Sequence, residues 1–247
     1  MIEKLFQLIK RLIQIGIRSP RDLLHVLGIA NSAAGGIIDP VADTRPIPSI
    51  NMLDICPGSN RWSLQSFPSV GASVSPLECV ALAALSCLVE AKRVFEFGTY
   101  KGVSTSQLAL NVGVDGMVFT LDLPEDHPAY SLPIPKPEER QIASEGGKGI
   151  LIPRDLLDRV TFLRHDSHTF DESPYTGTMD LVFVDGAHSY EYVKNDSEKG
   201  WRMLRRGGVI AWHDVVASHR DVVRYVKSCG HDVKLVGGTA LAYAIKP

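Results

Sequence analysis

The segment at residues 93–104 constrains the fold of this chain more than any other stretch. It opens with an apolar run at 94–97, which has the length of a β-strand, and then breaks at Gly98 and Gly102. Residues 103–110 can continue as a helix. A strand, a glycine turn and a helix in this order open a nucleotide-binding α/β unit, because glycine lets a ligand approach the backbone and the helix N-terminus offers free N–H groups.

Two residues of this turn disfavour a pyrophosphate ligand. Glu96 lies near the carboxyl end of the expected strand, where its charge repels a pyrophosphate and attracts a cation. Tyr100 occupies the position of the middle glycine in the G-x-G-x-x-G pattern of dinucleotide sites. The turn therefore favours a cationic ligand.

Length and composition set the broad class of the chain. Its 247 residues suffice for one large α/β domain with appendages or for two small domains, and 45% hydrophobic content can fill a core. A net charge of −2 without a basic stripe argues against nucleic-acid partners. The four cysteines form no C-x-x-C pair, and neither a signal-peptide pattern nor an apolar run of about 18 residues is present. We therefore expect a reduced, cytoplasmic protein without a transmembrane segment.

The first 74 residues precede the α/β pattern. Residues 1–28 have the spacing of two helices, the first of them basic and amphipathic. Such a segment packs against the domain or against a second subunit, as in a homo-oligomer, or else it binds a membrane surface. Residues 29–74 are rich in Gly, Pro, Ser and Asn and are expected to be a linker, with a lid at 44–74. The expected division is an N-terminal part, 1–74, and an α/β domain, 75–247.

The α/β domain alternates helices and strands. Ser75-Pro-Leu-Glu78 is a capping box that starts a buried helix over 76–91. Further strands are expected at 116–122, 160–164, 179–184 and 209–212, further helices at 190–205 and 218–228, and an antiparallel hairpin around Gly237-Gly238. The insert at 123–152 is rich in proline and charge, and its place at the carboxyl edge of the sheet suits a substrate lid.

Every strand expected from 94–97 to 209–212 carries polar side chains where it ends. These are Glu96, Asp122, Asp166 with Ser167, Asp185 with His188, and His213 with Asp214. Ligands of a parallel sheet bind beyond these ends. Any one of the residues could instead cap the next helix, but the row as a whole favours a ligand site. Asp122 lies 20 residues after Gly102, a spacing that suits a carboxylate binding ribose hydroxyls.

Asp185, His213 and Asp214 form a candidate metal site. They end consecutive strands, and neighbouring strands lie about 4.8 Å apart, so the three side chains could reach one cation. Such a set of oxygen and nitrogen ligands suits Mg²⁺, with Mn²⁺ or Fe²⁺ as alternatives; the other interpretation is that His213 and Asp214 only cap a helix. His188, beside the same tip, is the candidate catalytic base for a substrate hydroxyl.

Together these motifs resemble class I S-adenosylmethionine-dependent methyltransferases. The matching segments are 96–104, Asp122, 165–167, 180–188 and 207–214, and the resemblance covers roughly 75–247. The E-x-G-x-x-x-G-x-S loop and the D-G-x-H-S-Y segment are most similar to a group that includes metal-dependent macrolide-sugar O-methyltransferases and cephalosporin hydroxylase-like proteins.

The resemblance implies a doubly wound, Rossmann-like sheet of seven mostly parallel strands with an antiparallel last strand. It implies that S-adenosylmethionine contacts Glu96, Gly98, Thr99, Tyr100, Gly102, Ser104, Asp122, Asp166, Ser167 and Asp185. It also implies metal binding by Asp185 and Asp214, and the base role of His188. The sugar enzymes usually have Asp, Glu or Asn where this chain has His213, a departure that concerns the metal.

The expected function is metal-assisted O-methylation of a small polar, glycosylated or phenolic substrate. The sulfonium of the cofactor is cationic, which agrees with the acids at the strand ends. One alternative is a nicotinamide-dependent oxidoreductase of Rossmann type, although a second catalytic domain is missing and the terminal hairpin argues against it. The other is a relative that keeps the cofactor pocket without transferring methyl groups.

Overall fold

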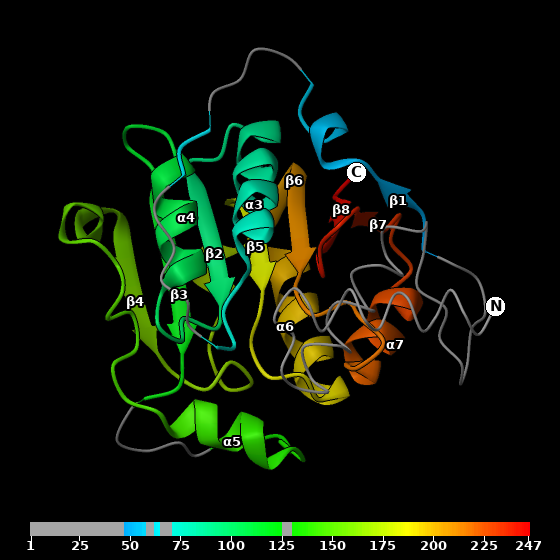
Figure 1. Cartoon of the computed structure of the whole chain (residues 1–247). Coiled ribbons are helices and arrows are strands. Elements are labelled where there is room, and N and C mark those ends of the chain that lie inside the picture. Colours follow the sequence, from blue (N-terminus) through cyan, green and yellow to red (C-terminus); the bar gives the residue numbers. More distant parts are fainter. Residues whose placement is uncertain (1–46, 58–61, 65–70, 125–129) are drawn as a thin grey trace, which may run out of the picture.

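The computed structural model describes residues 47–57, 62–64, 71–124 and 130–247. The two helices and the homo-oligomer contact expected in 1–28 lie outside these residues, as does much of the expected lid at 44–74. One eight-stranded sheet crosses the described part of the chain, in the order β1-β7-β8-β6-β5-β2-β3-β4 (Figure 1).

The sheet is mostly parallel. Its strands are β1 (Ser49–Ile50), β2 (Arg93–Phe97), β3 (Met117–Asp122), β4 (Val160–Arg164), β5 (Met179–Val184), β6 (Leu204–Trp212), β7 (Lys234–Val236) and β8 (Ala242–Ile245). Strand β8 runs antiparallel to both β6 and β7, while every other pair is parallel. The predicted doubly wound fold with an antiparallel last strand is confirmed, and so is the terminal hairpin.

The eighth strand, β1, was not predicted. Ser49 pairs with Leu235, and the neighbouring Ile47 and Ile55 are buried. A strand of two residues is too short to show an alternation of apolar and polar side chains, so only the pairing with β7 identifies it. The sheet therefore includes part of the segment that the sequence assigned to the N-terminal part.

Helices cover both faces of the sheet (Figure 1). They are α3 (Pro76–Leu88), α4 (Val103–Asn111), α6 (Tyr190–Met203) and α7 (Arg220–Ser228), with 3₁₀ turns at Met52–Asp54, Arg154–Arg159 and Ser173–Tyr175. Side chains alternate along each strand, so Val94 packs in the core layer with α3 and α4, and Phe95 packs in the layer with α6 and α7. Apolar side chains fill the space between the sheet and the helices on both faces. A ligand would therefore bind at the ends of the strands.

The insert at 123–152 contains a helix that the sequence did not predict, α5 (Pro137–Ser144). The arrowheads of β2, β3 and β6 point toward it, so α5 lies beyond the carboxyl ends of the parallel strands (Figure 1). This is the place expected of a lid. Among the described residues, no helix has both the length and the apolar character needed to cross a membrane.

Candidate active site

The turn after β2 packs directly on the tip of β5. Gly98 has a φ of +94°, and a Cβ at this position would lie 2.2 Å from the carbonyl oxygen of Asp185. Only glycine therefore allows the two strand ends to approach this closely. Tyr100, two residues on, also has a positive φ of 44°, which is uncommon for a residue with a side chain.

Asp122 holds this turn in shape. Its Oδ2 accepts hydrogen bonds from the backbone N–H groups of Thr99, at 3.0 Å, and Tyr100, at 2.9 Å. Its Oδ1 accepts one from Leu123 N, at 2.7 Å, and pairs with the ammonium of Lys148. Asp122 lines the cavity described below, as a ribose ligand must, but both of its oxygens already have protein partners.

Two residues of the predicted cofactor loop lie behind the wall of the cavity. Glu96 is fully buried, and its Oε2 accepts hydrogen bonds from the hydroxyls of Thr105, at 2.5 Å, and Thr120, at 2.7 Å. Gly102 packs against Ile152, where a Cβ would lie 2.5 Å from Cγ1. Neither lines the cavity, and in this structure they support the turn, so their contact with the cofactor stays a prediction.

Burial raises the pKa of Glu96 to about 7, although hydrogen bonds from Ser104, Thr105 and Thr120 oppose the shift. The carboxyl group is therefore only weakly anionic near neutral pH. Ser104, for which a cofactor contact is also predicted, lines the cavity.

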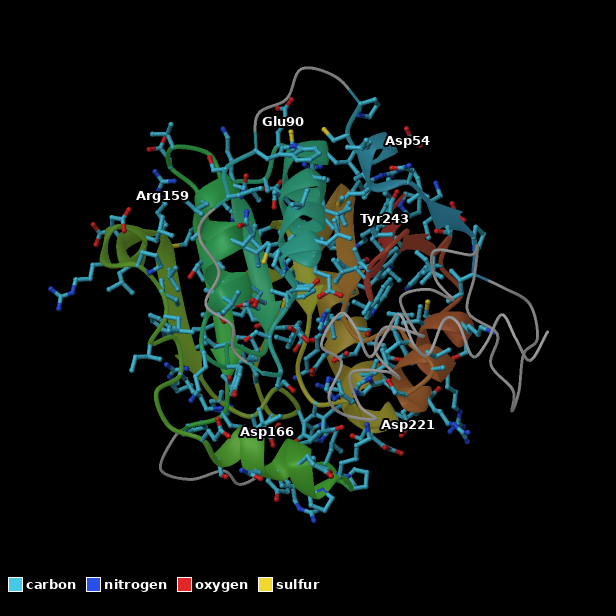
Figure 2. All side chains as sticks on the ribbon, viewed as in Figure 1. Asp54, Glu90, Arg159, Asp166, Asp221 and Tyr243 are labelled. Atoms are coloured by element: carbon cyan, nitrogen blue, oxygen red, sulfur yellow. The ribbon has the colours of Figure 1, made fainter. Side chains whose placement is uncertain are left out.

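Asp166 lies at the end of the sheet nearest α5, where Figure 2 labels it, and Ser167 follows it in the chain. The Asp166 carboxylate accepts hydrogen bonds from Ser131 N, at 2.5 Å, and His168 N, at 2.9 Å, and from the hydroxyl of Tyr192. Both Asp166 and Ser167 line the cavity. A buried acid that the sequence analysis missed, Asp196, lines it too, and burial raises its pKa to about 7.

The three predicted metal ligands meet at the tips of β5 and β6. The Nδ1 atom of His213 lies 3.0 Å from Asp185 Oδ1 and 3.3 Å from Asp214 Oδ2. One potential ligand atom from each residue falls within 4.8 Å of the others. Asp214 has a φ of +56°, a strained backbone conformation that directs its carboxylate into this group.

The charges of this group are strongly coupled. Burial would lower the pKa of His213, but Asp185, Asp214 and Glu78 raise it well above its usual value. Burial would raise the pKa of Asp214, but the two imidazoles of His213 and His188 hold it well below its usual range. The pKa of Asp185 is raised, chiefly by burial. The pocket therefore favours a cationic partner among its carboxylates.

His188 lies between two carboxylates. Its Nε2 is 2.9 Å from Asp214 Oδ2, and its Nδ1 is 3.1 Å from Oε1 of Glu139 on α5. Burial would lower the pKa of His188, but Asp214 and Glu139 raise it to about 10. In this arrangement His188 is an imidazolium that cannot accept a proton, so its predicted role as a base requires the loss of at least one of these contacts.

A cavity of about 710 Å³ joins these groups, a size that suits a small molecule. Its wall contains eleven of the thirteen predicted site residues: Gly98, Thr99, Tyr100, Ser104, Asp122, Asp166, Ser167, Asp185, His188, His213 and Asp214. The wall also contains four titratable residues that were not predicted: Glu139, Lys148, Asp196 and His219. Glu139 and Lys148 belong to the insert, whose lack of periodicity gave no signal for single residues.

Comparison with known proteins agrees with this arrangement. Residues 95–215 match a family model described as a methyltransferase domain. The match begins inside β2, runs through the cofactor turn and ends just after Asp214. It therefore spans both walls of the cavity.

The curated relatives are O-methyltransferases by name. A predicted O-methyltransferase of Mycobacterium sp. (strain JLS) is 33% identical over 147 residues, which cover 58% of this chain and 58% of the relative. A caffeoyl-CoA O-methyltransferase of Petroselinum crispum is 28% identical over 150 residues, or 57% of each chain. This chain thus matches somewhat more than half the length of these relatives.

Solved structures share the fold. An O-methyltransferase from Bacillus cereus, in complex with S-adenosylhomocysteine, is 22% identical and superposes with a TM-score of 0.51 over 72% of this chain and 84% of that one. An open, mostly parallel sheet with an antiparallel last strand and a cavity at its carboxyl edge defines a Rossmann-like methyltransferase fold. Residues 95–215 are thus similar to a methyltransferase domain, and the fold is the one that the resemblance to class I S-adenosylmethionine-dependent methyltransferases predicted. The nicotinamide-dependent alternative finds no support in these relatives.

Proposed function

We propose that this protein transfers a methyl group from S-adenosylmethionine to a hydroxyl oxygen of a small polar, glycosylated or phenolic substrate. One observation carries the proposal: the cofactor turn after β2 and the acid–histidine cluster of Asp185, His188, His213 and Asp214 open into the same cavity. A cofactor on the turn and an acceptor at the cluster would therefore be neighbours, which is what a displacement at the methyl carbon requires.

The cofactor side of the cavity is formed by the turn and by β3 and β4. S-Adenosylmethionine, when bound, supplies the methyl group on a cationic sulfonium. Gly98, Thr99, Tyr100 and Ser104 would contact its amino-acid part, and Asp122 its ribose. Because Lys148 already pairs with Asp122, a ribose hydroxyl would have to share this carboxylate with the ammonium or displace it.

The acid–histidine cluster fits a divalent cation. Adjacent ligands of an ion with bonds of about 2.1 Å are about 3 Å apart, and Nδ1 of His213 lies 3.0 and 3.3 Å from its two carboxylate neighbours. We propose that Asp185, His213 and Asp214 hold such an ion, with Mg²⁺ or Mn²⁺ favoured by the oxygen ligands and Fe²⁺ compatible with the imidazole. The ion would orient the acceptor hydroxyl and make it more acidic.

His188 is proposed to accept the proton of that hydroxyl. Its imidazolium state depends on the carboxylates of Asp214 and Glu139. If Asp214 held a cation, its charge would stabilise the protonated imidazole less, and Nε2 of His188 would be free to accept a proton. Movement of α5, which carries Glu139, would release the other ring nitrogen.

Turnover measurements test the proposal directly. The full chain is incubated with S-adenosylmethionine and a panel of catechols, phenolic thioesters and glycosides, with and without a chelator, and S-adenosylhomocysteine is quantified. We expect product with at least one hydroxylated acceptor and less product after chelation. Binding of S-adenosylhomocysteine without turnover on any acceptor would support the alternative hypothesis, in which the protein keeps the cofactor pocket but transfers no methyl group. Turnover that does not change after chelation would contradict the proposed role of the metal, while the proposal of methyl transfer would stand.

A further inference from the structure

Glu78, in the first turn of α3, is held in a fixed orientation. It is 1% exposed. Its Oε2 accepts a hydrogen bond from Ser75 N at 2.7 Å, and its Oε1 accepts one from Ala240 N at 2.8 Å. The first contact belongs to the capping box of α3, and the second joins the helix to the loop before β8. Two backbone donors therefore set the position of this carboxylate.

The same carboxylate contacts the acid–histidine cluster through His213, on the side of the ring that faces away from Asp185 and Asp214. Glu78 Oε2 lies 3.3 Å from Nε2 of His213. This distance is an ion-pair contact that falls short of a well-directed hydrogen bond, and among the described residues Nε2 of His213 has no hydrogen-bond partner. Because its nearest polar neighbour is an oxygen acceptor, Nε2 carries a hydrogen both in the imidazolium that the surrounding carboxylates favour and in the neutral tautomer that could bind an ion through Nδ1.

The other ring nitrogen of His213 has a different environment. Nδ1 lies within 3.3 Å of carboxylate oxygens of Asp185 and Asp214, the two acids of the proposed metal site. A neutral imidazole with its hydrogen on Nε2 has its lone pair on Nδ1. The lone pair would then point to the place where the two carboxylates converge.

We propose that Glu78 is a positioning residue that orients His213 as a metal ligand, by accepting the Nε2 hydrogen and leaving Nδ1 free to bind the ion. The inference rests on the proposed function only for the presence of the ion. Histidines that bind metals commonly donate their other N–H to a carboxylate, which fixes the tautomer and strengthens the ligand. Capping α3 does not require Glu78 to contact a histidine at the end of β6. The orientation of His213 is therefore a separate role from capping.

The test measures the affinity of the full chain for Mn²⁺, by electron paramagnetic resonance of the free ion. In Glu78→Gln, one oxygen becomes an amide nitrogen and the remaining acceptor is neutral. We expect Mn²⁺ to bind about 10- to 100-fold more weakly, while the affinity for S-adenosylhomocysteine, measured by calorimetry, is unchanged. Equal Mn²⁺ affinity in the variant and the parent chain would overturn the inference.

A matched control separates this role from helix capping. Ser75→Ala removes the hydroxyl that caps α3 but keeps the backbone N–H that Glu78 accepts. This variant is expected to melt at a lower temperature with unchanged Mn²⁺ affinity. A similar loss of Mn²⁺ affinity in Ser75→Ala would show that Glu78 acts through the helix and would count against the proposal.

A double-substitution cycle tests whether the effect passes through His213. In the His213→Asn background the imidazole is absent, so Glu78→Gln should cause no further loss of Mn²⁺ affinity. A loss of the same size in both backgrounds would overturn the inference. If the parent chain itself binds no Mn²⁺ but still binds S-adenosylhomocysteine, the positioning role is also overturned, whereas methyl transfer is tested independently by the turnover assay.

Discussion

His188 shows how one residue can have opposite chemical roles in two states of a site. With carboxylates at both ring nitrogens it is a cation, and the proposed role as a base requires that one of them is withdrawn. His219 is its ring neighbour, with centroids 4.5 Å apart, and burial lowers the pKa of His219 to about 4. The two adjacent imidazoles therefore differ in charge, because only His188 has two carboxylate partners.

The first prediction concerns the variant His188→Ala. Loss of a general base typically lowers turnover 10²- to 10⁴-fold, and we expect a decrease of this order in the turnover of S-adenosylmethionine with a hydroxylated acceptor. Binding of S-adenosylhomocysteine should be retained, because the cofactor turn lies on the other wall. His231→Ala is a suitable control, since His231 stacks on Trp201 and does not line the cavity. Unchanged turnover in His188→Ala would remove this residue from the mechanism.

The second prediction concerns the stability contributed by Glu96. Its pKa rises from 4.5 to about 7 on folding. Between these values the unfolded chain loses its proton first, so the free energy of unfolding falls as the pH rises and is constant above about 7. The shift corresponds to about 3 kcal/mol. Urea denaturation at pH 5 and pH 8 should therefore show a larger decrease for the parent chain than for Glu96→Gln.

Other buried groups also titrate in this range, so the difference between the two chains is the informative quantity. Asp196, for example, has a raised pKa of about 7 and remains in both. Glu191→Gln, at an exposed position in the first turn of α6, is the control and should follow the parent chain. Parallel stability curves for the parent and Glu96→Gln would contradict the raised pKa.

At this scale, most of the residues that the sequence predicted for the site do line the cavity, because strand ends are marked by apolar runs that stop at a polar side chain. The sequence did not predict in which direction each of these side chains points. Glu96 lies near the end of one apolar run and Asp122 ends another, yet the first is buried beneath the turn and the second lines the cavity. The direction of a side chain at a strand end depends on the local twist and on partners such as Thr105, which no spacing rule reveals.

Helix α5 is the part of the insert that contacts the acid–histidine cluster. Glu139 accepts a hydrogen bond from the backbone N–H of His188, at 3.2 Å, and its carboxylate contacts the ring of the same residue. Burial would raise the pKa of Glu139, but His188 and Lys136 lower it to about 2. The helix is therefore attached to the cluster by a charged contact that is mostly shielded from solvent.

The third prediction follows from this contact. In Glu139→Ala the backbone amides of α5 should exchange with deuterium about tenfold faster or more, because a hydrogen-bonded charge pair is lost. Lys136→Ala is the matched control: it removes the other partner of Glu139, but the Lys136 side chain is 45% exposed and such pairs contribute little. Equal exchange over residues 137–144 in the two variants would show that the contact with His188 does not hold α5 in place.

Element by element, the periodic segments were predictable and the irregular ones were not. The capping box at Ser75, the strands and the Gly237-Gly238 hairpin follow from local sequence rules, and all are present. Neither α5 nor β1 has enough apolar periodicity to be recognised. Both depend on tertiary contacts, with the cluster in one case and with β7 in the other.

The molecule as a whole should respond to its cofactor. On the proposed function, S-adenosylhomocysteine at 100 times its dissociation constant adds about 2.7 kcal/mol to the free energy of unfolding. For a chain of this length, that corresponds to a rise of about 5–10 °C in melting temperature. Differential scanning calorimetry should show this rise with S-adenosylhomocysteine and none with NAD⁺ at the same concentration. The opposite ranking of the two ligands would favour the oxidoreductase instead.

At the scale of the whole chain, the sequence predicted the architecture because the order of strands and helices leaves few permitted topologies. It did not predict how the insert closes over the strand ends. That arrangement depends on long-range contacts such as that of Ser131 with Asp166, whose positions in the sequence are 35 residues apart.

Several contacts fasten the insert to the cofactor side of the cavity, among them those of Ser131 with Asp166 and of Lys148 with Asp122. Between these points, α5 and its flanking turns form a wall of the cavity and contribute nothing to the sheet. Substitutions there can change the shape of the wall without unfolding the core. On the proposed function, acceptor preference could therefore diverge among descendants of this chain through changes in α5, while the turn after β2 keeps the same methyl donor.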